Sequence, residues 1–351
     1  MKALLLSEYS KLEVADLPQP AVEPGDVLVQ VAACGICGSD VHGYDGSTGR
    51  RIPPLVMGHE AAGVVAEVGA GVTRFSVGDR VTFDSTVYCG ACSYCLTGEI
   101  NLCDNRQVVG VSTPDFRRAG AFAEFVTVPE RIVYKLPDEL SFAEAAMLEA
   151  VSVALHAVVV SDLKGGETAL VIGAGMIGLL TLQAAKAAGC SLVIVADVDA
   201  TRLKLATEAG ADATILASGA AMVEQALGLT DGRGVDVVLE AVGREETVSG
   251  AVDAVRKGGT VTLIGNITPT VTLPLQKVVS RQIRMQGSCA SSGEYPQAME
   301  LIASGKVRVT PLITAVAPLS DGAQWFERLH SREPNLMKIV IDPRMQSGVG
   351  A

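Results

Sequence analysis

The stretch Thr168-Ala-Leu-Val-Ile-Gly-Ala-Gly-Met-Ile-Gly178 decides the fold, because an apolar run leads directly into a glycine-rich turn. The run 168–172 predicts a buried parallel strand, and the Leu- and Ala-rich segment 179–188 predicts a helix after the turn. A second apolar run, 192–196, follows at the spacing of a βαβ unit. This part of the chain is therefore predicted to be an α/β domain with a doubly wound parallel sheet.

The glycine-rich turn has the spacing of a dinucleotide-binding fingerprint. Its glycines allow a tight turn and a close approach to a pyrophosphate, which the free N–H groups at the start of the helix would stabilise. Asp197, at the end of the next strand, would accept hydrogen bonds from ribose hydroxyls and repel the 2′-phosphate of NADP, so NAD is expected. Alternatively, the glycines serve packing alone and Asp197 caps a helix. The residues predicted to hold NAD here are Gly173, Gly175, Met176, Ile177, Gly178 and Asp197.

The pattern of the chain changes on either side of this unit. Before it, short alternating segments such as 26–31 and 62–68 are separated by Gly and Pro turns, which predicts a β-rich domain. After it, the apolar segment Lys338–Ile341 predicts another strand close to the C-terminus. The predicted division is a β-rich segment 1–152, a Rossmann domain 153–287 and a C-terminal segment 288–351.

Composition limits the possible partners. At 351 residues and 48% hydrophobic content, the chain is long enough for two cores. Its net charge of -11 argues against nucleic acid or an anionic membrane as a partner. The first residues contain an apolar run too short for a signal peptide, and Glu149 and His156 interrupt the longest apolar stretch, 145–160. A cytoplasmic protein is expected.

Four cysteines gather in a short lobe, at about 86–106. Two, two and seven residues separate them, a spacing that can wrap one tetrahedral zinc ion. Four thiolates leave no position for water, so this zinc would be structural. An iron–sulfur cluster is the alternative, although the spacing matches neither ferredoxin pattern. The predicted ligands are Cys89, Cys92, Cys95 and Cys103.

A second group of potential ligands lies in the segments Cys34-Gly-Ile-Cys37-Gly-Ser39-Asp40 and Gly58-His59-Glu60. A catalytic zinc needs about three protein ligands and one open position. Spacing alone does not choose between Cys34 and Cys37. The two cysteines could instead form a redox pair, but such a motif belongs near a βαβ unit, and this one lies in the β-rich segment.

Together these motifs resemble the zinc-containing medium-chain dehydrogenases. The chain is most similar to their polyol branch, which includes sorbitol, xylitol, threonine and galactitol-phosphate dehydrogenases, and the resemblance covers essentially all of it. It implies a GroES-like catalytic domain, made of the N-terminal segment and the C-terminal tail, with a Rossmann domain between them. It also implies two zinc ions per subunit and a homodimer or homotetramer.

The resemblance assigns roles at the catalytic zinc. Cys37, His59 and Glu60 match its ligand positions, and Glu149 matches a glutamate that ligates zinc directly or through water. Asp40 would orient His59, and Cys34 becomes a small buried side chain. Family members commonly have Glu-Pro where this chain has Glu149-Ala150.

The same resemblance implies a mechanism. Zinc activates the substrate hydroxyl, hydride passes to the nicotinamide, and Ser39 accepts the proton and passes it toward His42. His42 is otherwise an ordinary surface residue. Arg202 matches a position that contacts adenosine, with a helical salt bridge as the alternative. Residues at the ends of later strands should line the nicotinamide pocket: Val242, Ile264, Gly265 and Asn266.

The predicted function is the NAD-dependent oxidation of a secondary alcohol of a polyol-like substrate to a ketone or ketose. A phosphorylated-polyol dehydrogenase is an alternative, suggested by Arg50-Arg51 in the loop before the zinc ligands. L-threonine dehydrogenase activity is another. The alternative from outside this class is a non-catalytic scaffold that binds NAD and zinc.

Overall fold

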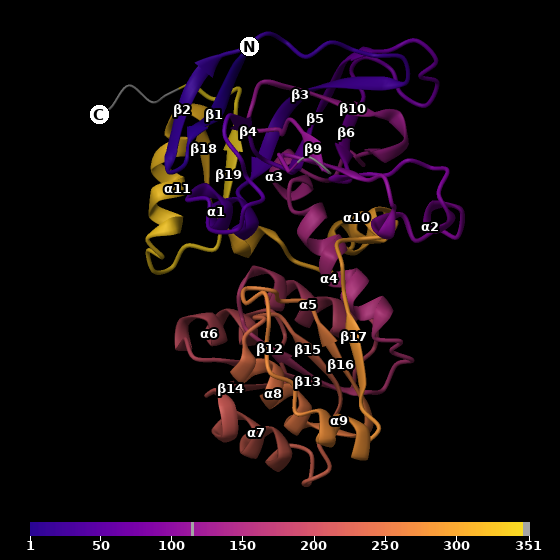
Figure 1. Ribbon diagram of the computed structural model, residues 1–351, viewed down its shortest axis with the longest axis vertical. Helices are drawn as coiled ribbons and strands as arrows, with labels where there is room; N and C mark the ends of the chain where they lie inside the picture. Colours follow the sequence, from indigo (N-terminus) through magenta and orange to yellow (C-terminus); the bar gives the residue numbers. More distant parts are fainter. Residues whose placement is uncertain (114–115, 347–351) are drawn as a thin grey trace. The chain divides into compact units, whose positions relative to one another are not determined.

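The computed structural model describes residues 1–113 and 116–346, which form two compact units (Figure 1). Of the described residues, the first unit contains those within 1–149, 295–303 and 309–346, and the second contains 150–294 and 304–308. Helix α4 (Leu148–Val160) carries the chain from the first unit into the second. The chain therefore leaves its β-rich unit and later returns to it.

The first unit is built on a sheet whose order is β11-β6-β5-β3-β19-β18, with β10 also paired to β3. The long central strand β3 is buried along most of its length, since its Val, Leu and Ala side chains serve the core. The strands of this sheet are β3 (Asp26–Gly35), β5 (Glu60–Val68), β6 (Arg80–Phe83), β10 (Phe125–Pro129), β11 (Val133–Lys135), β18 (Ile313–Pro318) and β19 (Lys338–Asp342).

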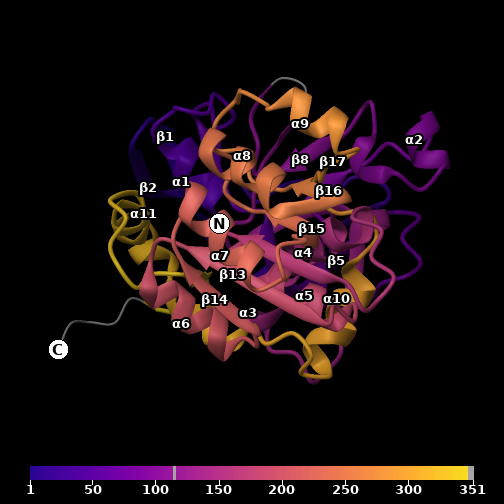
Figure 2. The same cartoon turned by 90° about the horizontal axis from the view of Figure 1, so that it is seen from below.

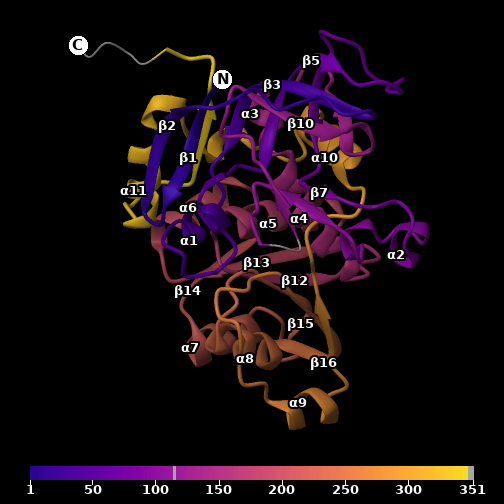
Figure 3. The same cartoon turned by 45° about the horizontal axis from the view of Figure 1, so that its top comes forward.

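The C-terminal part of the chain completes this unit. Strand β19 pairs antiparallel with β3, so that Ile341 lies opposite Cys34. Helix α11 (Gly322–His330) packs against β2 (Lys11–Asp16), which pairs with β1 (Lys2–Glu8), as Figure 3 also shows. The predicted strand at 338–341 is thus present and lies between β3 and β18.

The second unit contains six parallel strands in the order β14-β13-β12-β15-β16-β17. This order is that of a doubly wound dinucleotide-binding sheet, so the predicted fold class is confirmed. Figure 2 shows helices α5, α6, α7 and α8 around these strands. The strands are β12 (Thr168–Ile172), β13 (Leu192–Asp197), β14 (Ala213–Leu216), β15 (Val235–Glu240), β16 (Val255–Leu263) and β17 (Arg284–Gly287). The helices are α5 (Met176–Ala187), α6 (Ala200–Glu208), α7 (Gly219–Gly228) and α8 (Glu245–Ala254).

The lengths of the helices show whether any of them could cross a membrane. Helix α4 covers most of the longest apolar stretch and has 13 residues. Among the helices that the structure describes, none is long and apolar enough to span a bilayer.

Candidate active site

Three potential ligands from different elements meet in the first unit. Cys37 is the N-cap of α1 (Gly38–Tyr44), where its Sγ accepts a hydrogen bond from the Ser39 N–H at 3.5 Å. His59 immediately precedes β5, and Glu60 is the first residue of that strand. The ligand atoms of Cys37, His59 and Glu60 lie within 4.8 Å of one another. A thiolate, an imidazole and a carboxylate are donors that Zn²⁺ prefers, so these residues fit a zinc site with one open position.

The structure distinguishes between Cys34 and Cys37, which the sequence spacing left as equal candidates for a zinc ligand. Cys34 lies on β3, fully buried, and burial raises the pKa of its thiol well above the usual range. Among the residues that the structure describes, the group of potential ligands contains Cys37 and not Cys34. Cys34 is therefore part of the core.

Asp40 lies directly behind His59. Its Oδ2 atom is 3.4 Å from the Nδ1 atom of His59, which leaves Nε2 as the nitrogen available to a metal. Burial opposes the charged imidazole, yet the Asp40 carboxylate and the Cys37 thiolate hold the pKa of His59 well above its usual value. Burial likewise opposes the Asp40 carboxylate, but His59 and Arg51 lower its pKa to about 2. The surrounding side chains thus favour positive charge at His59.

Lys338 reaches the same site from β19. Its Nζ atom donates to Glu60 Oε2 at 2.5 Å and to the carbonyl of Ile36 at 3.2 Å, and its side chain is only 3% exposed. Burial lowers the pKa of Lys338, but the Glu60 carboxylate and the Cys37 thiolate outweigh it and raise the value. This lysine was not predicted. The available signal was a charged residue at the head of the apolar run 339–341.

Glu149 lies in the first turn of α4 and is half-buried. Within the described chain it is not among the side chains whose ligand atoms lie within 4.8 Å of one another. Burial raises its pKa to about 7, and the charges of His59 and Glu60 act on it in opposite directions. Glu149 therefore belongs to the electrostatic surroundings of the three ligands and stands outside their immediate group.

The two residues predicted to carry the proton lie on α1. Ser39 and His42 are both exposed, and three positions separate them, which places them on one face of the helix. Arg51, by contrast, is buried and donates to Asp40 Oδ1 and to Ser39 Oγ. The expectation that the pair Arg50-Arg51 could bind a phosphate is wrong for Arg51, because internal acceptors already engage its guanidinium. Arg50 remains exposed.

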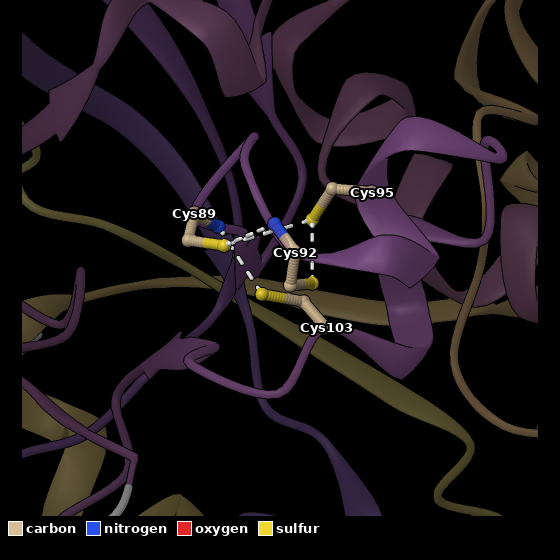
Figure 4. Close-up of side chains that lie close together, drawn as sticks. All are labelled: Cys89, Cys92, Cys95 and Cys103. Carbon is tan, nitrogen blue, oxygen red and sulfur yellow. Dashed lines mark hydrogen bonds between the residues drawn. The ribbon is translucent and has the colours of Figure 1, made fainter.

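The four cysteines of the lobe surround one point (Figure 4). Their sulfur atoms all lie within 4.8 Å of one another, with Cys92 Sγ 3.5 Å and Cys89 Sγ 3.9 Å from Cys95 Sγ. Zinc–sulfur bonds of about 2.3 Å place the sulfurs of a tetrahedral site about 3.8 Å apart. These sulfur positions fit a single zinc ion, whereas a cluster of several iron atoms needs more room.

Hydrogen bonds in the lobe favour thiolates. The N–H groups of Ala91 and Cys92 both donate to Cys89 Sγ at 3.4 Å and lower the pKa of this thiol to about 6. Backbone hydrogen bonds also lower the pKa of Cys92, whereas burial raises that of Cys95 to about 12. Cys103 Sγ accepts from the Cys89 N–H at 3.2 Å. The backbone thus favours the thiolate form, which binds zinc, at Cys89 and Cys92.

In the second unit, the glycine-rich turn connects β12 to α5. Gly173 has a φ of +97°, and a side chain at Gly178 would collide with the Gly173 carbonyl. Gly175 is the N-cap of α5 and contributes no side-chain cap, so Met176 and Ile177 begin the helix with free N–H groups. This is the geometry that lets a pyrophosphate approach a helix N-terminus.

Asp197, at the end of β13, is bound to the same turn. Its Oδ2 accepts from the Ala174 N–H at 2.6 Å and its Oδ1 from the Asp199 N–H at 2.9 Å. Each carboxylate oxygen keeps a further lone pair for a ribose hydroxyl. Arg202 is exposed, and its Nε is 3.8 Å from Asp199 Oδ2, the arrangement of the helical salt bridge that was the alternative to contact with adenosine.

The turns that follow β15 and β16 lie together. The Glu240 carboxylate accepts from the N–H groups of Val242 and Gly243 at 2.9 Å, and its carbonyl accepts from those of Ile264 and Gly265 at 2.8 and 3.0 Å. Glu240 was not predicted, although a buried acid at the end of an apolar strand is a recognisable signal. It brings Val242, Ile264 and Gly265 to one end of the sheet, where Asn266 follows, exposed.

Comparison with protein families agrees with both units. Residues 23–138 match the family model described as the alcohol dehydrogenase GroES-like domain. Residues 177–304 match the model described as zinc-binding dehydrogenase.

Individual relatives cover nearly the whole chain. Sorbitol dehydrogenase of Bacillus subtilis is 33% identical over 347 residues, 98% of this chain and 97% of the relative. D-xylulose reductase A of Aspergillus niger is 36% identical over 338 residues, 94% and 93% of the two chains. The crystal structure of galactitol-1-phosphate dehydrogenase from Escherichia coli is similar with a TM-score of 0.89 at 28% identity, over 98% and 100% of the two chains.

The four-cysteine lobe yields a stability prediction. Cys92→Ser removes one thiolate ligand, so the purified protein should contain one zinc fewer per chain, and its unfolding midpoint should fall by about 5 °C or more. Elemental analysis and a thermal melt measure the two effects. Cys289→Ser, an exposed cysteine outside the lobe, should change neither. An unchanged zinc content and midpoint in Cys92→Ser would contradict a structural metal.

Proposed function

The chain belongs to the polyol branch of the zinc-containing medium-chain alcohol dehydrogenases, and on this premise we propose that it oxidises a secondary alcohol of a polyol to a ketone or ketose with NAD. One observation carries the proposal: the same chain contains a Cys, His and Glu ligand group and a glycine-rich turn that is hydrogen-bonded to Asp197. This combination disfavours a non-catalytic scaffold.

Cys37, His59 and Glu60 would hold the catalytic zinc. When bound, zinc supplies Lewis acidity that lowers the pKa of a coordinated hydroxyl, as it lowers that of water from about 15.7 to about 7. Asp40 keeps His59 oriented through Nδ1, and Lys338 holds one oxygen of Glu60. In this proposal, the Glu60 carboxylate accepts a hydrogen bond from Lys338 and also ligates the metal.

The proton of the substrate hydroxyl needs a route to solvent. Ser39 follows the ligand Cys37 by two residues and is exposed, so its hydroxyl is suited to accept this proton. His42 lies on the same helix face, is exposed, and can release the proton to water. Glu149, with its pKa near 7, adds a carboxyl that can exist in either protonation state at neutral pH.

NAD would bind to the second unit. The free N–H groups after Gly175 would hold its pyrophosphate, and the lone pairs of Asp197 would accept from the adenosine ribose. The residues at the ends of β15 and β16 would flank the nicotinamide, which accepts the hydride: Val242, Ile264, Gly265 and Asn266.

The relatives support a polyol as the substrate, because their names describe enzymes of sorbitol, xylulose and galactitol 1-phosphate. A phosphorylated polyol is the second candidate, for which the exposed Arg50 offers one cation. L-Threonine completes the set of substrates to compare.

Self-association is also part of the proposal. Strand β17 is the edge of the parallel sheet, and the neighbouring helix α9 (Leu275–Ser280) exposes Leu275 and Val279. Exposed apolar side chains beside an unpaired strand edge support a homodimer or homotetramer formed there. Light scattering would measure the oligomeric mass of the wild type and of Val279→Lys, and we expect a smaller mass for the variant.

A four-cysteine metal site needs reduced thiols, so the four-cysteine lobe supports a cytoplasmic location.

A substrate panel tests the function. Sugar alcohols, diols, threonine and polyol phosphates should be compared by NADH absorbance, with the highest kcat/KM expected for a free polyol. Cys37→Ser should lower kcat/KM at least about a hundredfold and leave the fold and NAD binding intact, because it removes a metal ligand alone. Cys289→Ser is the matched control. Full activity in Cys37→Ser, or NAD reduction with no compound of the panel, would refute the proposed reaction.

Cofactor choice has a separate test. The wild type should have a higher kcat/KM with NAD than with NADP, since the Asp197 carboxylate repels a 2′-phosphate. Asp197→Ser should lower the NAD-to-NADP ratio by about tenfold or more, whereas Asp199→Ser, which removes a carboxylate from the cap of α6, should leave the ratio close to that of the wild type. A wild type that prefers NADP would overturn this role of Asp197.

A further inference from the structure

Arg51 occupies a buried position beside the three ligands. Its side chain is 4% exposed, in a loop whose preceding residue, Arg50, is exposed. Gly43 on α1 makes this position possible, because a side chain there would collide with Cγ of Arg51. A buried guanidinium is costly unless acceptors satisfy it, so its partners indicate its role.

Those partners belong to two different parts of the proposed site. The Nε and Nη2 atoms of Arg51 donate to Asp40 Oδ1 at 3.1 and 2.9 Å, and Nη2 also donates to Ser39 Oγ at 3.2 Å. The other oxygen of Asp40, Oδ2, faces His59 Nδ1 at 3.4 Å. One side chain thus contacts both the carboxylate that orients a metal ligand and the hydroxyl suited to take the proton.

The hydrogen bond from Arg51 to Ser39 determines which hydrogen bonds the serine hydroxyl can still donate and accept. A guanidinium has donors only, whereas a serine hydroxyl has one donor hydrogen and two lone pairs. Arg51 therefore occupies one lone pair of Ser39. The hydroxyl keeps one lone pair to accept a proton and one hydrogen to pass on, the arrangement that one-directional transfer requires. The adjacent positive charge also stabilises negative charge on the oxygen as the hydrogen leaves.

We propose that Arg51 is a positioning residue that holds Asp40 against His59 and keeps Ser39 oriented for proton transfer. This proposal rests on the function proposed above. Arg51 touches neither substrate nor cofactor in this role. It acts through Asp40 on the binding of the metal and through Ser39 on the rate of turnover.

Metal retention provides a test without turnover. Arg51→Gln keeps a polar side chain but lacks the charge and the forked donors, so its catalytic zinc should be bound about 10- to 100-fold more weakly. Chelator competition followed by elemental analysis measures this, and the zinc of the four-cysteine lobe serves as the internal reference. Arg50→Gln removes the same charge one residue earlier, at an exposed position, and should retain both zinc ions like the wild type. Equal retention of the catalytic zinc in Arg51→Gln and Arg50→Gln would overturn the proposal.

Turnover at saturating zinc, polyol and NAD tests the link to Ser39. Arg51→Gln should lower kcat about 10-fold or more with little change in the KM for NAD. In a Ser39→Ala background the same substitution should change kcat less than about threefold, because the group through which Arg51 acts is already absent. Independent, multiplicative losses in the double variant would show that Arg51 does not act through Ser39.

A conservative variant, Arg51→Lys, keeps the role of Arg51 testable if Arg51→Gln misfolds. Arg51→Lys keeps the charge but cannot reach two acceptors with a planar fork, so its zinc retention and kcat should lie between those of the wild type and Arg51→Gln. If Arg51→Gln does not fold, Arg51→Lys is measured in its place, and wild-type values for both quantities would refute the role. A wild type that oxidises no alcohol would refute the proposed reaction, and zinc retention would still decide the role of Arg51.

Discussion

Buried negative charge is the constraint on which the first unit depends. The Asp40 and Glu60 carboxylates both lie close to His59, and both are almost completely buried. Such a group is stable only when cations compensate it. The chain supplies Arg51 to Asp40 and Lys338 to Glu60, and the three donors, Cys37, His59 and Glu60, fit an added metal ion.

This compensation explains why the C-terminal tail belongs to the first unit. Lys338 can reach Glu60 because β19 pairs with the end of β3, where the same sheet also presents the start of β5. A tail that packed elsewhere would leave a buried carboxylate without its cation. The segment that follows the Rossmann unit is therefore joined to the β-rich unit in two ways. Strand β19 pairs with β3, and Lys338 forms an ion pair with Glu60.

The sequence predicted features that are continuous along the chain and missed those that join distant segments. Strands β12 and β13 were predicted, because buried parallel strands are nearly unbroken apolar runs. Strand β14 was not, since this edge strand has only four residues and is half-exposed. The cysteine lobe and the glycine turn are local patterns. Lys338 lies 278 residues from Glu60, so that only the folded chain reveals their contact.

The pairing of β19 with β3 also sets an order of events during synthesis. The four cysteines of the lobe are complete once residue 103 has left the ribosome, so that lobe can take up its metal early. The pocket of Cys37, His59 and Glu60 acquires its internal counter-ion only when residue 338 has emerged and β19 has joined the sheet. Until then, the Glu60 carboxylate lacks the lysine that balances it in the folded chain.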